Sequence, residues 1–187
     1  MLIQPILTRA RYIVLSTQRA KRLVTLKEIA ICAILGTVMF VTKLLMAALP
    51  NIHLVGVFII VFTFVFRVKA LLSIYLYVIL EGLYFGFTPW WVPYLYIWTI
   101  LWGIIMLFPK RTPIKVQCVV FPVICCLHGL FFGALFAPVQ AVMFGMNFEQ
   151  TLAWIAAGLS FDILHAVGNM CAGLLAVPLI RALKRIV

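Results

Sequence analysis

The sequence predicts an all-α membrane protein in which six transmembrane helices form a bundle and both termini lie in the cytoplasm. Of its 187 residues, 66% are hydrophobic and only 10% are charged, and the mean hydropathy is +1.22. A soluble domain of this length cannot bury so much apolar surface, whereas a lipid bilayer is itself an apolar solvent. Because each spanning helix needs about 20 apolar residues, the length allows six spans and no separate soluble domain.

The placement of the basic residues predicts the orientation of the chain. The net charge is +11, and apolar stretches divide the basic side chains into four clusters. The clusters comprise Arg9, Arg11, Arg19, Lys21, Arg22 and Lys27; Arg67 and Lys69; Lys110, Arg111 and Lys115; and Arg181, Lys184 and Arg185. Since cytoplasmic segments are enriched in Lys and Arg, this alternation predicts that all four clusters lie inside. A nucleic-acid-binding protein would instead gather its charges on one continuous face, so no nucleic-acid partner is expected.

Two parts of the chain are expected. Residues 1–26 form a basic cytoplasmic or interfacial segment without the apolar core of a removable signal peptide, and residues 27–187 form the six-helix transmembrane domain. The predicted helices cover residues 27–49, 52–66, 69–87, 91–108, 115–144 and 148–185. The last two exceed the thickness of a bilayer and should tilt, kink or protrude, with Pro122 and Pro138 as natural kink sites.

Three turns are predicted on the outer side, at residues 50–53, 86–91 and 145–149. The densest aromatic cluster of the chain begins in the middle turn and comprises Trp90, Trp91, Tyr94, Tyr96, Trp98 and Trp102. An aromatic belt at the membrane interface would explain a single tryptophan. Six aromatic residues beside two prolines exceed what anchoring needs, and ligand binding by some of them is the alternative.

Polar side chains in the membrane-spanning segments are further candidates, because each is costly unless it faces the bundle interior. Lys43 lies near the outer end of the first helix, where it could extend to the headgroups or contact a ligand. Glu81 lies about one turn below an outer loop. We expect it to point inward, toward a basic partner such as Lys43 or toward the ligand.

Three polar residues share one face of the sixth predicted helix. Asp162, His165 and Asn169 are spaced three and four residues apart, which aligns them along a helix. They form either an interhelical hydrogen-bond seam or the floor of a binding pocket. His128 and Gln140 on the fifth helix are weaker candidates, because a lone polar residue among glycines more often packs between helices.

Small residues mark faces where helices approach closely. Ala30, Ala33 and Thr37 share one face of the first helix, and Gly129 and Gly133 repeat the pattern on the fifth. Such faces pack either within one protein or against a partner subunit, and the spacing alone does not separate the two.

No motif predicts catalysis or metal binding by this chain. The sequence has no Gly-x-x-x-x-Gly-Lys-Ser/Thr loop, no His-Glu-x-x-His pattern and no nucleophile elbow around Ser160. Its five cysteines lack the paired spacing of a metal site or disulfide framework. Two alternatives stay open: a small intramembrane enzyme that uses Glu81, Asp162 and His165, and a structural or assembly subunit without a ligand.

The chain resembles the substrate-binding S components of energy-coupling factor (ECF) vitamin transporters over about residues 27–185. The resemblance rests on the six predicted helices, the inside termini, the missing ATPase motif and four segments. These segments are Ala48-Leu-Pro-Asn-Ile-His, Leu80-Glu-Gly-Leu-Tyr-Phe-Gly-Phe, Trp90-Trp-Val-Pro-Tyr-Leu-Tyr-Ile-Trp and Phe161-Asp-Ile-Leu-His-Ala-Val-Gly-Asn. They are most similar to the branch linked to cobalamin (vitamin B12) or its precursors, and another vitamin or heterocycle is the alternative ligand.

The resemblance implies a multi-pass protein of the prokaryotic cell membrane that binds a vitamin under its three outer loops. The candidate ligand-binding residues are Lys43, Asn51, His53, Glu81, Tyr84, Trp90, Trp91, Tyr94, Gln140, Asp162, His165 and Asn169. The wide aromatic mouth and its few hydrogen-bonding groups would suit cobalamin, which is large, amphipathic and nearly neutral.

The resemblance also implies partners. S components associate with a transmembrane coupling subunit (T component) and two cytoplasmic ATPases, which bind ATP and Mg²⁺, so no cofactor is expected in this chain. In the family, alanines four apart on the first helix contact the coupling subunit. Here Ala30, Ala33 and Thr37 form the corresponding stripe, although the two alanines are three apart and position 34 is Ile.

Overall fold

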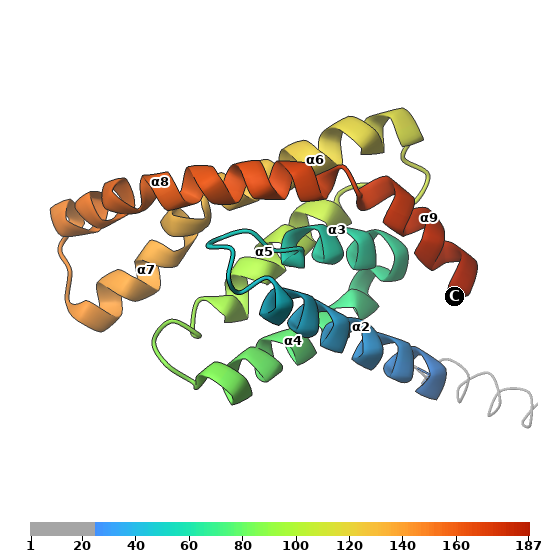
Figure 1. The fold of residues 1–187 in the computed structure, drawn as a ribbon, viewed down its shortest axis with the longest axis horizontal. Helices are drawn as coiled ribbons and strands as arrows, with labels where there is room; N and C mark the ends of the chain where they lie inside the picture. The colour runs from blue at the N-terminus through green and yellow to red at the C-terminus, as the bar shows by residue number, and fades with distance from the viewer. Residues whose placement is uncertain (1–24) are drawn as a thin grey trace, which may run out of the picture. The chain divides into compact units, whose positions relative to one another are not determined.

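The computed structural model describes residues 25–187, and all regular secondary structure in this part of the chain is helical. The elements are α2 (Leu26–Leu45), α3 (Val55–Phe66), the 3-10 turn η1 (Arg67–Lys69), α4 (Ala70–Phe85), α5 (Tyr94–Met106), α6 (Ile114–Leu130), α7 (Phe132–Phe144), α8 (Phe148–Gly173) and α9 (Ala176–Ile186) (Figure 1). The predicted all-α class is confirmed for these residues. Residues 1–24 of the predicted basic segment 1–26 lie outside the described residues.

Four helical stretches of the described chain are long and apolar enough to cross a membrane. They are Leu26–Leu45, Val55–Phe85, Ile114–Phe144 and Phe148–Gly173, and Tyr94–Met106 is a shorter apolar helix. This length and composition indicate a protein that is embedded in a membrane. The stretch Val55–Phe85 is not one continuous helix, because Arg67 adopts a left-handed φ of 59° and separates α3 from α4.

The chain divides into two units, residues 1–31 and 32–187. Of the first unit, the structure describes residues 25–31, where α2 begins. The Thr25 amide donates to Glu28 Oε2 (2.9 Å), and the Glu28 amide donates to Thr25 Oγ1 (3.3 Å). This reciprocal pair is a capping box, which satisfies amides that the first turn of a helix leaves unpaired. All the candidate ligand-binding residues lie in the second unit.

Within the second unit, α2 and α4 lie side by side and run in the same direction. A Cβ atom on Gly36 would lie 2.7 Å from the Ser73 carbonyl oxygen, so this close approach requires glycine. Further along the same two helices, Lys43 pairs with Glu81. The connecting helix α3 is the most deeply buried, with nine of its 12 residues inside.

Helix α8 packs antiparallel to α6 and α7. A Cβ atom on Gly129 of α6 would lie 2.9 Å from the His165 carbonyl oxygen, and one on Gly173 would lie 2.6 Å from Pro122 Cα. The residue numbers on α6 therefore fall as those on α8 rise. The small-residue face that includes Gly129 packs within the chain, against α8.

The predicted fifth helix is two helices, and the break lies at Phe131. Both prolines stand inside helices that continue through them, Pro122 in α6 and Pro138 in α7. Membrane helices tolerate proline where neighbouring groups satisfy the backbone. At the start of α7, Asp162 Oδ1 accepts a hydrogen bond from the Gly133 amide (3.1 Å), which provides a partner for one of the amides freed by the break.

The predicted sixth helix is also two helices. α8 ends at Gly173, and α9 begins at Ala176. Val177 and Ile180 of α9 are buried, whereas its basic side chains Arg181, Lys184 and Arg185 are exposed. This two-sided pattern is amphipathic and differs from that of a spanning helix.

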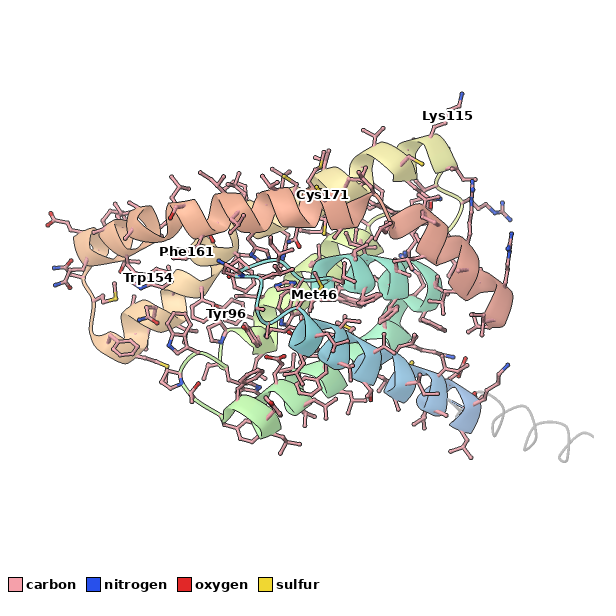
Figure 2. The ribbon with its side chains drawn as sticks, in the orientation of Figure 1. Met46, Tyr96, Lys115, Trp154, Phe161 and Cys171 are labelled. Carbon is pink, nitrogen blue, oxygen red and sulfur yellow. The ribbon has the colours of Figure 1, made fainter. Side chains whose placement is uncertain are left out.

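The second unit has two chemically different ends, and Lys115 lies at one of them with Trp154 toward the other (Figure 2). The end that we call the basic end carries Arg67, Lys69, Lys110, Arg111, Lys115, Arg181, Lys184 and Arg185. Its parts meet through aromatic contacts, since Lys184 Nζ lies 5.1 Å from the Phe64 ring centre and Phe64 packs on Phe121. At the opposite end, residues 46–54 and 86–93 connect the helices.

Candidate ligand-binding site

Three adjoining cavities open where residues 46–54 and 86–93 connect the helices. Their volumes are about 250, 230 and 420 Å³. Tyr94 lines all three, Lys43 and Phe85 line the first two, and Trp90 lines the first and third. The cavities thus share walls and form one site, the mouth. It is lined by Lys43, Met46, Ala47, Leu49, Pro50, Asn51, Ile52, His53, Glu81, Phe85, Gly86, Thr88, Trp90, Trp91, Tyr94, Phe132, Gly133, Phe136, Trp154, Ile155, Gly158, Phe161, Asp162 and His165.

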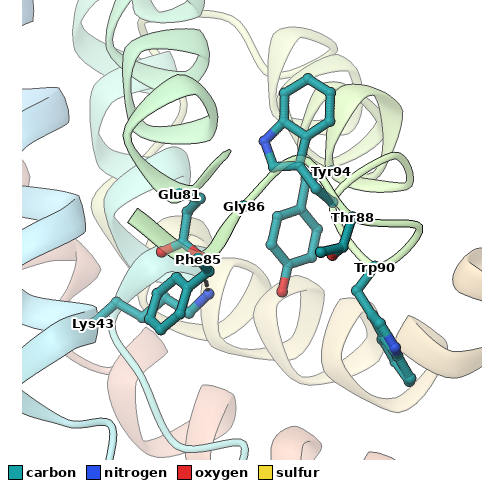
Figure 3. A pocket seen from close by; sticks show the side chains of 8 residues that line it. Lys43, Glu81, Phe85, Gly86, Thr88, Trp90 and Tyr94 are labelled. Atoms are coloured by element: carbon teal, nitrogen blue, oxygen red, sulfur yellow. Dashed lines mark hydrogen bonds and ion pairs between the residues drawn. The ribbon is translucent and has the colours of Figure 1, made fainter. Parts of the chain in front are cut away.

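An ion pair between α2 and α4 forms one wall of the mouth. Lys43 Nζ lies 2.6 Å from Glu81 Oε2, and Figure 3 shows this pair facing Tyr94 across the first cavity. The ammonium group also lies 5.1 Å from the Tyr94 ring centre and 5.8 Å from that of Phe85. Lys43 therefore points into the bundle, where Glu81 and the aromatic faces stabilise its charge.

The aromatic cluster separates into residues that face the mouth and residues that do not. Trp90 is 59% exposed and packs against Phe136 with ring centres 5.0 Å apart. Trp91 lines the first cavity, but its indole Nε1 donates to the Val78 carbonyl (2.7 Å), which anchors the loop to α4. Trp90 is thus available to a ligand, whereas Trp91 also holds the structure together.

The remaining aromatics of this cluster belong to the core or to other contacts. Trp98 is 1% exposed and lies at the centre of the bundle. Trp102 donates from Nε1 to the Arg67 carbonyl (3.1 Å) at the basic end. The Tyr96 hydroxyl donates to the Leu135 carbonyl of α7 (2.5 Å). Because α5 turns every 3.6 residues, its aromatic side chains point to several faces, and only some reach the mouth.

The polar face of α8 contributes two residues to the mouth. Asp162 lines the third cavity and His165 the second, and both are buried. Asn169 is buried one turn further, where the space around Gly56 and Gly129 is filled by its amide group, and it lines none of the three cavities. On this face, Asp162 and His165 therefore form part of a cavity wall, whereas Asn169 packs between helices.

The loop before α3 contributes His53 and Asn51. The His53 ring lies 4.9 Å from the His165 ring, and both line the second cavity. Burial lowers the pKa of His53 well below its ordinary value, and the nearby His165 and Lys43 lower it further, so the imidazole is neutral at pH 7. Asn51, with a left-handed φ of 56°, lines the second and third cavities.

Two candidate ligand-binding residues lie elsewhere. Tyr84 is exposed and packs against Phe40 and Phe85, and Gln140 lies half-buried on α7. Neither lines the three cavities of the mouth.

The predicted docking residues are exposed. Ala33 and Thr37 lie on the part of α2 in the second unit, and the Thr37 hydroxyl donates to the Ala33 carbonyl of its own helix (2.9 Å). Ala30, in the first unit, is also exposed. Their contact with a coupling subunit stays a prediction.

The mouth also contains aromatic residues that the sequence analysis did not single out. They are Phe85, Phe132, Phe136, Trp154 and Phe161. On α8 a signal was present, because Trp154, Gly158 and Phe161 precede His165 at spacings of three and four and so extend the same helical face toward the outer turn. On α7, Phe132 and Phe136 are four residues apart and share one face, but the sequence does not show which face points inward.

Several buried polar atoms around the mouth have no hydrogen-bond partner within the described chain. They include Glu81 Oε1, His53 Nδ1 and His165 Nε2. Buried polar groups are usually satisfied, so a cluster of exceptions beside a cavity indicates a place where other polar groups can bind.

The described residues contain no group of three His, Cys, Asp or Glu side chains that could hold a metal ion. Glu81 pairs with Lys43, and Asp162 pairs with the Gly133 amide on the far side of the mouth. Two residues of the enzyme alternative, Glu81 and Asp162, therefore have separate partners on different sides of the mouth.

Comparison of the chain with protein-family models, curated proteins and solved structures finds no match.

Proposed function

We propose that this chain is the substrate-binding S component of an ECF transporter in a prokaryotic cell membrane, and that its ligand is cobalamin or a corrinoid precursor. The observation that carries the proposal is the mouth itself. Three cavities share walls at one end of the bundle, and aromatic side chains with a few polar groups line them. Ligand sites for small molecules have this composition.

The proposed topology has six spans: α2, α3, α4, α5, the pair α6 and α7, and the pair α8 and α9. In its favour, α3 and α4 are separate helices on either side of Arg67, and α5 is a further apolar helix. The basic end would then face the cytoplasm and the mouth would face outward. A ligand would enter from outside, and both termini would lie inside.

The proposed partners act at the other side of the membrane. The chain has no phosphate-binding loop of the Walker type, so two ATPase subunits would hydrolyse ATP and a coupling subunit would connect them to this chain. The exposed Ala33 and Thr37 of α2 are the proposed contact with the coupling subunit, since small residues permit close helix approach. The chain itself would bind and release the ligand without chemical change.

Binding of cyanocobalamin to the purified chain in detergent tests the proposal, with Trp90→Ala as the informative variant. Trp90 is exposed in the mouth, and loss of one stacking contact of about 1–1.5 kcal/mol should weaken binding about tenfold. Phe144→Ala is the matched control. Phe144 is also 59% exposed and lines none of the three cavities, so its removal should leave binding unchanged.

The two variants separate the possible outcomes. If the wild type, Trp90→Ala and Phe144→Ala bind cyanocobalamin equally well, Trp90 does not contact the ligand and is instead an interfacial anchor. Absence of cobalamin binding at micromolar concentration in the wild type would refute the proposed ligand. Another vitamin or heterocycle would then be the next ligand to test.

A further inference from the structure

The charged groups of the mouth already have partners within the chain. Lys43 and Glu81 form an ion pair of 2.6 Å, and the Asp162 carboxylate accepts a hydrogen bond from Gly133 at the start of α7. The positive end of a helix dipole favours a carboxylate at that position. A charged ligand would have to displace one of these partners and leave a buried charge without one. The mouth therefore favours a ligand that is uncharged where it touches these groups.

The ion pair nevertheless retains hydrogen-bonding capacity toward the first cavity. Glu81 is 3% exposed and lines this cavity, and its Oε1 atom has no hydrogen-bond partner in the described chain. The Lys43 ammonium group has three N–H donors, of which one reaches Glu81 Oε2. This region thus has more polar capacity than the protein uses.

An amide group has the complementary pattern. Its carbonyl oxygen accepts and its N–H donates, side by side and without net charge. We propose that the mouth recognises an uncharged ligand through a carboxamide or a ring amide, whose oxygen accepts from Lys43 and whose N–H donates to Glu81 Oε1. This inference rests on the proposed function, because it specifies the chemical group that the same site binds.

The aromatic surroundings favour the same class of ligand. Tyr94 faces Lys43 with 5.1 Å between the ammonium group and the ring centre, and Trp90 lines the first cavity beside it. Aromatic faces exclude water from the amide contacts, and a hydrogen bond to a charged group is stronger where water is excluded. A carboxylate in the same place would be repelled by Glu81, and an amine would compete with Lys43 for it.

The test compares benzamide with benzoate, two probes of the same shape that differ in charge. Binding to the full-length chain in detergent is followed by tryptophan fluorescence at pH 7.5. We expect benzamide to bind at least tenfold more tightly than benzoate. The double variant Lys43→Met/Glu81→Met removes both charges at once, so that no buried charge is left unpaired, and it should abolish the preference. Phe144→Ala should retain it.

The same measurements with cyanocobalamin separate this inference from the proposed function. Equal or tighter binding of benzoate, a preference that persists in the double variant, or no binding of either probe would overturn the amide contact. Cyanocobalamin binding that the double variant leaves unchanged would also overturn it, while the proposed function stands. A benzamide preference that depends on the ion pair, without cyanocobalamin binding, would refute the proposed ligand and retain the amide contact.

Discussion

The two ends of the second unit satisfy their polar groups in different ways. At the basic end, Arg67 donates from Nη1 to the Phe108 carbonyl (2.8 Å) and from Nη2 to the Met106 carbonyl (2.5 Å). These carbonyls lie at and beyond the end of α5, where a helix leaves acceptors unpaired. Trp102 in turn donates to the Arg67 carbonyl. The chain itself thus completes this network.

At the mouth, the chain leaves comparable groups incomplete. Glu81 Oε1, His53 Nδ1 and His165 Nε2 are buried without hydrogen-bond partners in the described chain, and all three residues line cavities of the mouth. A protein gains stability when its buried polar groups are paired, so these unpaired groups do not contribute to stability in this way. The hydrogen bonds of Arg67 thus stabilise the basic end, whereas several polar groups at the mouth keep hydrogen-bonding capacity that the proposed ligand would use.

The largest effect on stability is expected at the basic end. Arg67→Met removes two charge-assisted hydrogen bonds at the end of α5 and should lower the free energy of unfolding by about 3 kcal/mol. Unfolding in detergent, followed by circular dichroism, measures this change. Arg111→Met, at an exposed position of the same end, should remain within about 0.5 kcal/mol of the wild type. A variant of Arg67 that kept its stability and lost ligand affinity would contradict the comparison.

A smaller effect is expected from protonation of His53. The folded chain lowers the pKa of His53 below the ordinary value, so below about pH 6.5 the unfolded chain takes up the proton first. The stability that a neutral His53 contributes is present above this pH and is lost as the pH falls toward the folded pKa, by up to about 1.4 kcal/mol per pH unit.

The pH dependence is measured as the difference between the wild type and His53→Gln, which cannot titrate at this position. The variant should lose less stability than the wild type between pH 7 and pH 5.5. Parallel curves for the two proteins would show that His53 is not held neutral by the fold.

The smallest effect separates the two neighbouring tryptophans of the mouth. Trp91→Phe keeps the ring but removes the hydrogen bond to the Val78 carbonyl, and should lower the free energy of unfolding by about 1 kcal/mol. Trp90→Phe should leave stability within about 0.5 kcal/mol of the wild type, because the exposed Trp90 anchors no backbone group in this way. Equal losses in both variants would remove the distinction between an anchoring and a ligand-facing tryptophan.

Much of the helical order could be predicted from apolar runs and the prolines between them. Helices α3 to α5 lie inside their predicted ranges, and α2 begins one residue before its predicted range, at Leu26. The agreement is close because Pro50, Pro89 and Pro109 stand in the connecting loops and do not continue a helix. The number of spans and their orientation remain predictions.

The two helix breaks could not be read from the sequence. The break at Phe131 is accompanied by a hydrogen bond from the Gly133 amide to Asp162, 29 residues later, and a local pattern does not contain such a contact. In the separate helix α9, Val177 and Ile180 are buried in the bundle, which is again a tertiary contact.

The candidate site could be predicted in part, where residue chemistry and spacing agree. Lys43 and Glu81 were recognisable as costly charges in apolar helices, and Asp162 and His165 as one helical face. Tyr84 and Gln140 do not reach the mouth. Their prediction as ligand-binding residues was wrong for these cavities, because the sequence alone does not give the rotation of α4 and α7 about their axes. The same uncertainty hid Phe132 and Phe136, which enter the mouth only through the broken geometry after α6.

We propose above all that a cobalamin-type ligand enters at the mouth and that ATP hydrolysis by partner subunits at the opposite end drives its uptake. Uptake of labelled cobalamin by cells that lack their own cobalamin transporter tests it most directly, with this chain expressed alone and together with a coupling subunit and two ATPases. We expect uptake that requires both the chain and the energising subunits and that falls in Trp90→Ala but not in Phe144→Ala. Absence of uptake above background from cells that contain all the subunits would contradict it.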